Sequence, residues 1–195
     1  ASIDDLSYQF VTIADKTAFN SGSVIPFDDV TIYEGSYVST RYTVNTSNVE
    51  QRFLINSDRV DTTTLSVVVQ NSSTDTTQTT FTLATDIAAL TSTSNVYFLQ
   101  EVEEGKYEIY FGDGILGTAV STDNIVIMNY VVTNKGAANG ASTFSSASAI
   151  ATVNSVNVVT VSESAGGAEP ETIESIKYNA PLDYASQGRC VTTED

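Results

Sequence analysis

The chain has 195 residues, 41% of them hydrophobic and 16% charged, which is typical of a globular protein with one domain or two closely packed domains. Its formal charge of −16 argues against a nucleic-acid partner, because phosphate binding depends on Lys and Arg. The chain has no histidine and a single cysteine, Cys190, which excludes an internal disulfide, histidine metal sites and Ser-His-Asp or Cys-His catalysis.

The first part of the chain shows short runs of alternating polar and apolar residues. Residues 6–13 and 30–33 are two such runs, and each predicts a strand. After a turn at Gly35, residues 38–44 place apolar side chains on one face and polar side chains on the other, as a half-buried strand does. We assign residues 1–60 to an N-terminal β segment that belongs to a larger domain of a longer protein.

A predicted hairpin follows. The runs 65–69 and 81–83 are rich in β-branched or alternating residues, and the polar residues 71–77 form a loop between them. Residues 58–64, which precede the hairpin, are predicted to be a polar connection. After the hairpin, Asp86 is placed to cap about one turn of helix.

Three apolar runs, 96–102, 106–111 and 125–133, are the strongest structural signal in the sequence. They are separated by Gly105 and by the cluster 112–114, which supply the positive φ angles of tight reversals, so we predict an antiparallel meander. The last run is apolar on both faces, which predicts a central strand covered on both sides.

Residues 144–161 are rich in valine and predict one or two further strands. With them, residues 61–165 form an antiparallel β domain that contains the meander. The predicted fold class is therefore mainly β, with antiparallel sheets in a sandwich or barrel-like arrangement and a short C-terminal helical segment.

The composition changes at residues 166–167, a Gly-Gly pair that predicts a hinge. Residues 169–171 place Pro and acidic residues where a helix starts, and Pro181 is expected to stop or bend this helix. Residues 182–187 then predict a second short helix, closed by Gly188 as its C-terminal cap.

The predicted helical tail, residues 166–195, is the best candidate for an interface. An apolar stripe is expected along it, which packs on the β body or docks into another chain. The tail ends with a threonine cap and acidic residues that have no helix behind them, so we expect it to be truncated. The candidate interface residues are Ile173, Ile176, Tyr178 and Leu182.

Two patterns suggest chemistry, and both have simpler explanations. The turn 112–114 lacks the alternating ligands and distal glutamate of an EF-hand calcium loop, so a structural hairpin is favoured. Glu101, Glu103 and Glu104 cluster near Glu108, and two such carboxylates could act as a glycosidase pair, but the chain has no Trp or His to complete such a site. We therefore expect no enzyme activity, no cofactor, no metal site and no catalytic residue.

Four parts of the sequence carry a resemblance to a known family. They are residues 111–117, residues 124–126 with Tyr130, residues 136–141 and the tail from Ala168 to Asp195. Together they resemble the baseplate J-like family, and within it the large baseplate wedge subunits of T-even-type contractile-tailed phages. The tail departs from the family pattern at Cys190, where the family usually has alanine, and it lacks the tyrosine that follows the aspartate. The signature turn comprises Phe111, Gly112, Asp113, Gly114 and Gly117.

The resemblance implies a structural protein of the phage tail baseplate, assembled in the host cytoplasm. It implies that copies of the full-length protein dimerise and contact other baseplate wedge proteins. No nucleic-acid or membrane partner is expected. The alternative is an adhesin or tail-fibre-like β-sandwich binding module, whose unfolding would depend on calcium and so on a chelator.

Overall fold

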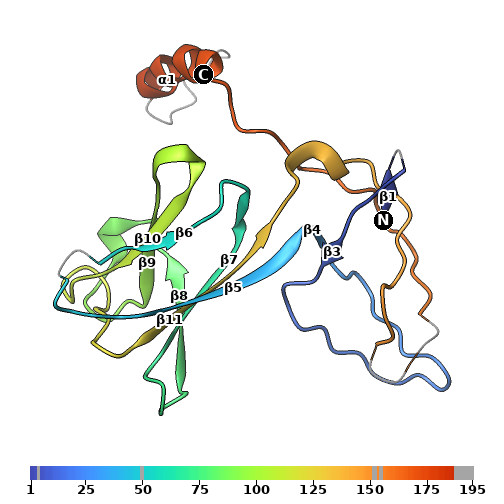
Figure 1. The fold of residues 1–195 in the computed structure, drawn as a ribbon, viewed down its shortest axis with the longest axis horizontal. Helices are drawn as coiled ribbons and strands as arrows, with labels where there is room; N and C mark the ends of the chain where they lie inside the picture. Colours follow the sequence, from blue (N-terminus) through green and yellow to red (C-terminus); the bar gives the residue numbers. More distant parts are fainter. Residues whose placement is uncertain (4, 49–50, 151–152, 154–155, 187–195) are drawn as a thin grey trace.

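The structure is a computed structural model that describes residues 1–3, 5–48, 51–150, 153 and 156–186. A seven-stranded sheet with the strand order β5-β11-β7-β8-β9-β10-β6 forms its centre (Figure 1). All neighbours in this sheet are antiparallel except the β8–β9 pair, which is parallel. The strands are β5 Ser36–Thr43, β6 Phe53–Ile55, β7 Val60–Gln70, β8 Gln78–Leu83, β9 Val96–Glu101, β10 Tyr107–Phe111 and β11 Ile125–Val132.

The two edge strands of this sheet, β5 and β6, approach each other and nearly close it into a barrel. The hydroxyl of Tyr42 on β5 donates to the backbone oxygen of Leu54 on β6 at 2.7 Å. The Tyr42 ring also packs edge-on against Phe53, with the ring centroids 5.8 Å apart. The predicted fold class, mainly β with antiparallel sheets and a C-terminal helix, is confirmed.

Aromatic side chains from several strands fill the barrel. Phe111 packs edge-on against both Phe53 and Phe81, at centroid distances of 5.7 and 5.1 Å. Edge-to-face pairs of this kind add to the roughly 1.5–3 kcal/mol that burial of each such side chain contributes. The largest side chains with less than 2% exposure are Phe53, Ile55, Val67, Ile109, Val126, Met128 and Val131.

Strand β11 is central and covered on both faces, as its sequence predicts. It lies between β5 and β7, with Val126 and Met128 in the barrel core. On its other face Val131 is fully buried against the backbone at Gly35. An added Cβ at Gly35 would lie 2.2 Å from the Val132 oxygen, so this position requires glycine.

The predicted three-strand meander is only partly correct. Strands β9 and β10 form the expected hairpin, but β10 pairs with β6 on its other side and not with β11. Strand β11 needs long neighbours on both edges to satisfy its backbone, and β5 and β7 supply them. Residues 112–124 therefore carry the chain away from β10 to the far part of the sheet.

The predicted polar connection at residues 58–64 is wrong, because β7 already begins at Val60. Val60 and Asp61 pair with the end of β11, and the register then shifts. At this irregularity the buried hydroxyl of Thr64 accepts from the Val131 nitrogen at 2.9 Å and donates to the Asp61 oxygen at 2.7 Å. A polar sequence can thus form a central strand where side-chain hydroxyls replace ladder hydrogen bonds.

Two smaller two-stranded sheets lie in the N-terminal flank, which differs from the longer strands predicted there. Pairs form between β1 Ser2–Ile3 and β2 Leu6–Ser7, and between β3 Phe10–Val11 and β4 Tyr33–Glu34. Residues 6–13 are thus split between β2 and β3, and the strand predicted at 30–33 begins only at its last residue.

The strands predicted at residues 144–161 are also wrong. Within the described part of this range there is one isolated bridge, between Ile150 and Val153, and no strand. Val159 and Val161 are 76% and 83% exposed, so no neighbouring element offers them a face to cover or a strand to pair with.

Among the described residues, three short 3-10 helices and one α-helix complete the fold. They are η1 Ile87–Ala89, η2 Glu103–Gly105, η3 Lys135–Ala138 and α1 Ile173–Ser186. The predicted cap at Asp86 is confirmed, because its carboxylate accepts from the Ala88 nitrogen at 2.9 Å.

Helix α1 is a single helix that continues through Pro181, so the prediction of two short helices is wrong. Pro181 leaves the Lys177 carbonyl without its usual donor, and water can replace that donor because this part of the helix is exposed. The helix begins at Ile173, after Thr172 rather than at Pro170; the Thr172 hydroxyl accepts from the Ser175 nitrogen at 3.3 Å. The predicted cap at Gly188 lies outside the described residues.

Candidate interaction surfaces

The turn that follows β10 is held together by Asp113. The Asp113 carboxylate accepts from the backbone nitrogens of Ile115 at 2.9 Å and Leu116 at 3.0 Å, and the Gly114 nitrogen donates to the Gly117 oxygen at 3.0 Å. The hydrogen bond from Leu116, followed by that from Ile115, lowers the pKa of Asp113. This is the local bonding of an Asx turn, which needs no bound ion.

Glycines at both ends let this turn close on itself and dock onto a neighbouring loop. An added Cβ at Gly112 would lie 2.3 Å from the Leu116 oxygen, and Gly117 has a φ of 89°. The Gly117 nitrogen donates to the Thr91 oxygen at 3.0 Å, and the Thr118 nitrogen donates to the Ser94 oxygen at 2.8 Å. The turn joins β10 to a remote loop and is not the hairpin that the sequence predicts.

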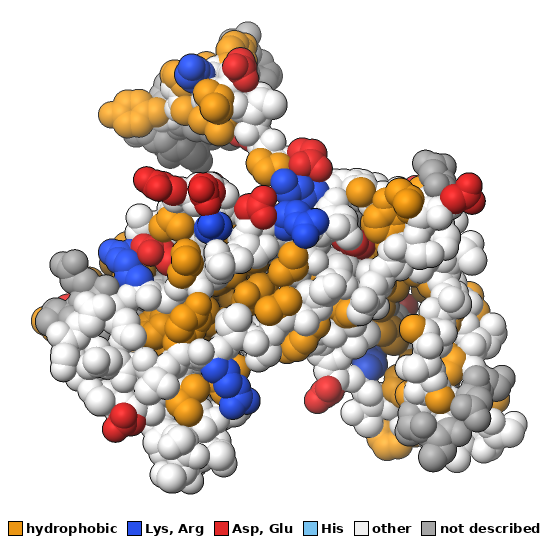
Figure 2. Space-filling model, in the orientation of Figure 1, with side chains coloured by type: hydrophobic (Ala, Val, Ile, Leu, Met, Phe, Trp, Pro, Cys, Tyr) orange, Lys and Arg blue, Asp and Glu red, His pale blue; other side chains and the backbone are white. Residues whose placement is uncertain are grey.

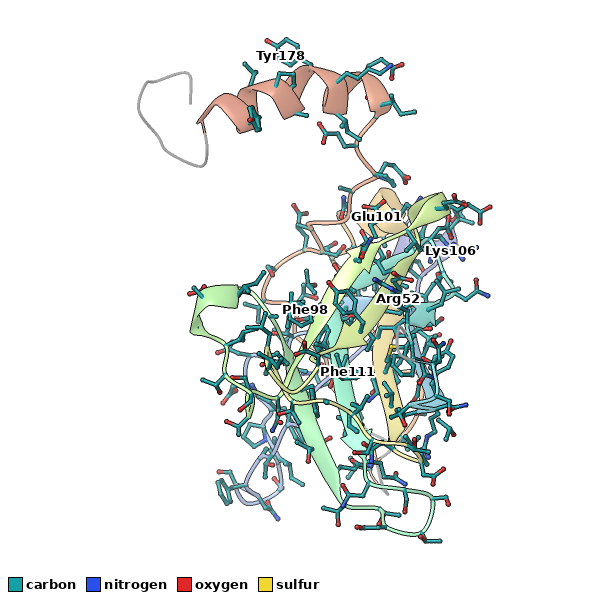
Figure 3. All side chains as sticks on the ribbon, turned by 90° about the vertical axis from the view of Figure 1, so that its left-hand side faces the viewer. Arg52, Phe98, Glu101, Lys106, Phe111 and Tyr178 are labelled. Atoms are coloured by element: carbon teal, nitrogen blue, oxygen red, sulfur yellow. The ribbon has the colours of Figure 1, made fainter. Side chains whose placement is uncertain are left out.

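The carboxylates of the β9–β10 hairpin do not form a pair. Glu108 lies opposite Gln100 in the ladder and Glu101 lies opposite Tyr107, so Glu101 and Glu108 point to opposite faces of the sheet. Arg52 bonds Glu108 at 2.7 Å, and its guanidinium lies 4.7 Å from the Tyr110 ring centroid. Figure 3 shows Arg52, directly before β6, and Glu101, at the end of β9, at separate places.

The described residues offer little else for ligand chemistry. No group of three or more His, Cys, Asp or Glu among them could hold a metal ion. An open depression of about 140 Å³ lies between residues 118–124 and the strands β7 and β8, and no ionisable group lines it. Its lining residues are Val69, Asn71, Thr79, Phe81, Asn95, Thr118, Ala119, Val120 and Asn124.

The chain leading to α1 is fixed to the loop after β11. The side-chain amide of Asn139 donates to the Gly167 oxygen at 2.7 Å and its oxygen accepts from the Gly167 nitrogen at 3.0 Å. The Ser164 nitrogen donates to the Ala141 oxygen at 2.9 Å, and the Gly140 nitrogen donates to the Ser164 oxygen at 2.7 Å. Gly167 also lies against the backbone of Lys135. The second residue of the predicted hinge at 166–167 is therefore fixed in place.

Helix α1 stands apart from the barrel and exposes its apolar side chains (Figures 1 and 3). Ile173 is 65% exposed and Tyr178 is 74% exposed. At 100° per residue, Tyr178 lies about 140° around the helix from Ile173. Leu182 lies on the Tyr178 side and Ile176 on the Ile173 side. The four candidate residues therefore form two opposite faces rather than one stripe.

Comparison with known proteins identifies the barrel. Residues 39–143 match a family described as bacteriophage baseplate wedge protein gp6, third domain. The chain belongs to this family. It is also 30% identical over 129 residues to the baseplate wedge protein gp6 of Enterobacteria phage T4, an alignment that covers 53% of the chain and 19% of that relative. The chain is therefore a structural component of the virion tail baseplate, and the adhesin alternative is not favoured.

The gp6 third-domain match covers both the signature turn and the loop that holds the tail, whereas α1 lies outside it. The resemblance used the turn, the loop 136–141 and the tail as separate segments. In the structure, Asn139 and Gly167 join the last two of these segments. In the sequence, Asn139 is only an asparagine within a glycine-rich loop, and nothing there indicates that it bonds to Gly167.

Sequence analysis missed two exposed apolar side chains in the signature turn. Ile115 and Leu116 are 74% and 44% exposed at its tip, while Phe111 enters the barrel core. Their position follows from the Asp113 hydrogen bonds, which turn the backbone outward at these residues. A sequence pattern that shows only a tight turn gives no indication of which side chains it presents.

Proposed function

We propose that the chain acts as a non-enzymatic building block in assembly of a contractile-tail baseplate, through protein–protein contacts on its outer surface. The observation that carries this proposal is the gp6 third-domain match over the whole barrel. The opposite orientation of Glu101 and Glu108 supports a non-enzymatic role, because it separates two of the carboxylates in the suggested cluster.

The proposed partners are a second copy of the full-length protein and other baseplate wedge proteins, as the likeness to the baseplate J-like family implies. The charge of −16 disfavours nucleic acid as a partner. Among the described residues, no helix has the length and hydrophobicity needed to cross a membrane. Assembly would take place in the host cytoplasm, before the baseplate enters the virion.

The proposed contact element is α1. Its exposed side chains on opposite faces suit a helix that is covered from two sides in the assembled particle. The signature turn, residues 111–117, is proposed to shape the barrel rather than to bind.

The division of the chain at residues 60 and 165 stays a proposal; β5 and β6, from residues 1–60, are hydrogen-bonded into the main sheet.

The proposal is tested by placing charges on each face of α1 in the full-length protein of an infecting phage. The double variants Ile173→Asp with Ile176→Asp, and Tyr178→Asp with Leu182→Asp, are expected to reduce complete baseplates at least about tenfold, since buried interface anchors carry most of the binding energy. Electron microscopy and sedimentation of infected-cell extracts measure complete baseplates against free subunits.

The matched control is Lys177→Gln, which changes charge on the same helix without removing an apolar side chain. Thermal unfolding of the barrel should be the same in all variants, because α1 stands apart from it. Normal numbers of baseplates from both double variants would contradict a contact role for α1. An unfolding curve that shifts when a chelator is added would support a calcium-dependent adhesin instead.

A further inference from the structure

The two segments that flank the barrel, one before β5 and one after β11, meet on one side of it. Phe10 from the N-terminal flank packs edge-on against Phe144 from the C-terminal flank, with ring centroids 5.0 Å apart. The Gly35 nitrogen, at the entrance to the barrel, donates to the Gln9 oxygen at 2.9 Å. Both flanks extend to the same side of the barrel in Figure 1. Since the family match spans 39–143, the chain enters and leaves the matched domain at neighbouring points.

Both flanks combine exposed apolar side chains with an absence of charge. Residues 17–27 and 136–162 contain no Asp, Glu, Lys or Arg, in a chain with 24 acidic residues. Phe19 is 89% exposed in the first segment, and Val161 is 83% exposed in the second. Figure 2 shows orange, hydrophobic side chains on this part of the surface. A charge-depleted apolar surface of this kind is typical of one that is covered in the native protein.

The secondary structure of the flanks is also incomplete. Each of the sheets β1–β2 and β3–β4 has two strands of two residues. Isolated two-stranded pairs are marginally stable in water and need further strands or a packed face. Both sheets thus retain free edges onto which additional strands can pair.

From these observations we propose that the flanks are the beginning of a second domain, whose core is completed by polypeptide that lies outside residues 1–195. The gp6 third domain is then an insertion between the two halves of that second domain. The T4 relative is long enough for such an arrangement, because the alignment covers only 19% of it. This inference does not depend on the proposed role of α1.

Polypeptide joined to the flanks is a better candidate to cover their exposed surface than a second copy of the chain. Segments joined to both flanks are held near the exposed surface at an effective concentration on the order of millimolar. A second copy of the chain would have to reach this surface from solution, without such a covalent link.

Amide hydrogen exchange tests whether further polypeptide covers the flanks. It is measured in the 195-residue chain and in the longer polypeptide encoded by the same gene, both kept monomeric. In the 195-residue chain, amides of residues 17–27 and 156–161 should exchange rapidly. In the longer polypeptide they should exchange at least about 100-fold more slowly, because the completed domain protects them. Amides of β11 should exchange at the same rate in both proteins.

Substitutions sharpen this test. Phe19→Asp and Val159→Asp, made separately in the longer polypeptide, should remove the added protection, whereas Ile87→Asp should not, since Ile87 is 60% exposed on the barrel. Three results would overturn the proposal. They are rapid exchange in both proteins, protection of the 195-residue chain that grows with its concentration and indicates a second copy, and protection that arises only after another wedge protein is added.

Discussion

The barrel and its flanks use apolar residues in opposite ways. In the barrel, Phe53 and Ile109 have at most 1% exposure, whereas Phe19 and Val161 in the flanks have more than 80%. Both regions are rich in β-branched and aromatic residues, so composition alone does not decide burial. Burial requires strands that pair in a closed or nearly closed sheet, and in the part of the chain that the structure describes the barrel has such strands and the flanks do not.

Removal of one phenylalanine from each region gives the largest expected contrast. Phe53→Ala should lower the free energy of unfolding by about 3–5 kcal/mol, because it leaves a cavity beside Phe111 in the barrel. Phe19→Ala should change it by less than about 0.5 kcal/mol, since that ring is exposed. Urea unfolding of the 195-residue chain measures both. Similar losses would mean that the flank has a core of its own.

The signature turn gives the next largest effect. In Gly112→Ala the new methyl group would lie 2.3 Å from the Leu116 oxygen, a clash with rigid backbone, and should cost about 1–3 kcal/mol of stability or more. Gly136→Ala is a matched control in the loop beside the C-terminal flank, because its nearest atom is at 3.5 Å. Thermal unfolding that is equal in the two variants would show that the turn can relax.

Local pattern predicted the strands of the barrel better than their neighbours. The period of two in residues 106–111 and the two apolar faces of 125–133 both depend on side-chain burial, and the structure confirms both. The partner of β10 is β6, more than 50 residues earlier in the chain, and no local signal encodes this pairing. The Gly112-Asp113 turn was wrongly predicted to be a hairpin, because its docking partner at Thr91 is likewise remote in sequence.

In the flanks, by contrast, local pattern predicted strands that the described residues do not form. Residues 144–161 have the composition of strands, yet the structure has only one bridge in their described part. A strand needs a partner to satisfy its backbone groups, and the described residues offer no strand that pairs with this segment. The candidate interface on α1 was likewise inferred from composition, and helical geometry divides it into two faces.

A smaller effect is expected at the junction between barrel and tail. Asn139→Ala removes two hydrogen bonds to Gly167, each worth about 0.5–1.5 kcal/mol. Amides of residues 164–168 should therefore exchange at least about fivefold faster, while amides of β11 are unchanged. Asn157→Ala, at an exposed position of the same flank, is the control. Unchanged exchange at 164–168 would show that Ser164 alone holds the tail.

The smallest expected effect is the pH dependence that Asp113 gives to the barrel. Backbone hydrogen bonds from Leu116 and Ile115 lower the pKa of Asp113 in the folded protein, so its contribution is full above its unfolded pKa and is lost as pH falls through the folded value. The stability difference between the native chain and Asp113→Ala should therefore be largest at neutral pH and shrink below about pH 4. Urea unfolding at several pH values measures this difference.

The comparison between variants is necessary because protonation of the other carboxylates also changes the stability of a chain with a formal charge of −16. Asp113→Asn keeps a side-chain acceptor but cannot titrate, so the native chain should lose stability relative to it as pH falls. A difference between the native chain and Asp113→Ala that is negligible at both pH 3 and pH 7 would mean that the turn is held by the packing of Gly112 and Gly117 and not by the carboxylate. The turn would then be determined by close backbone contacts alone, like the contact between Gly35 and Val132.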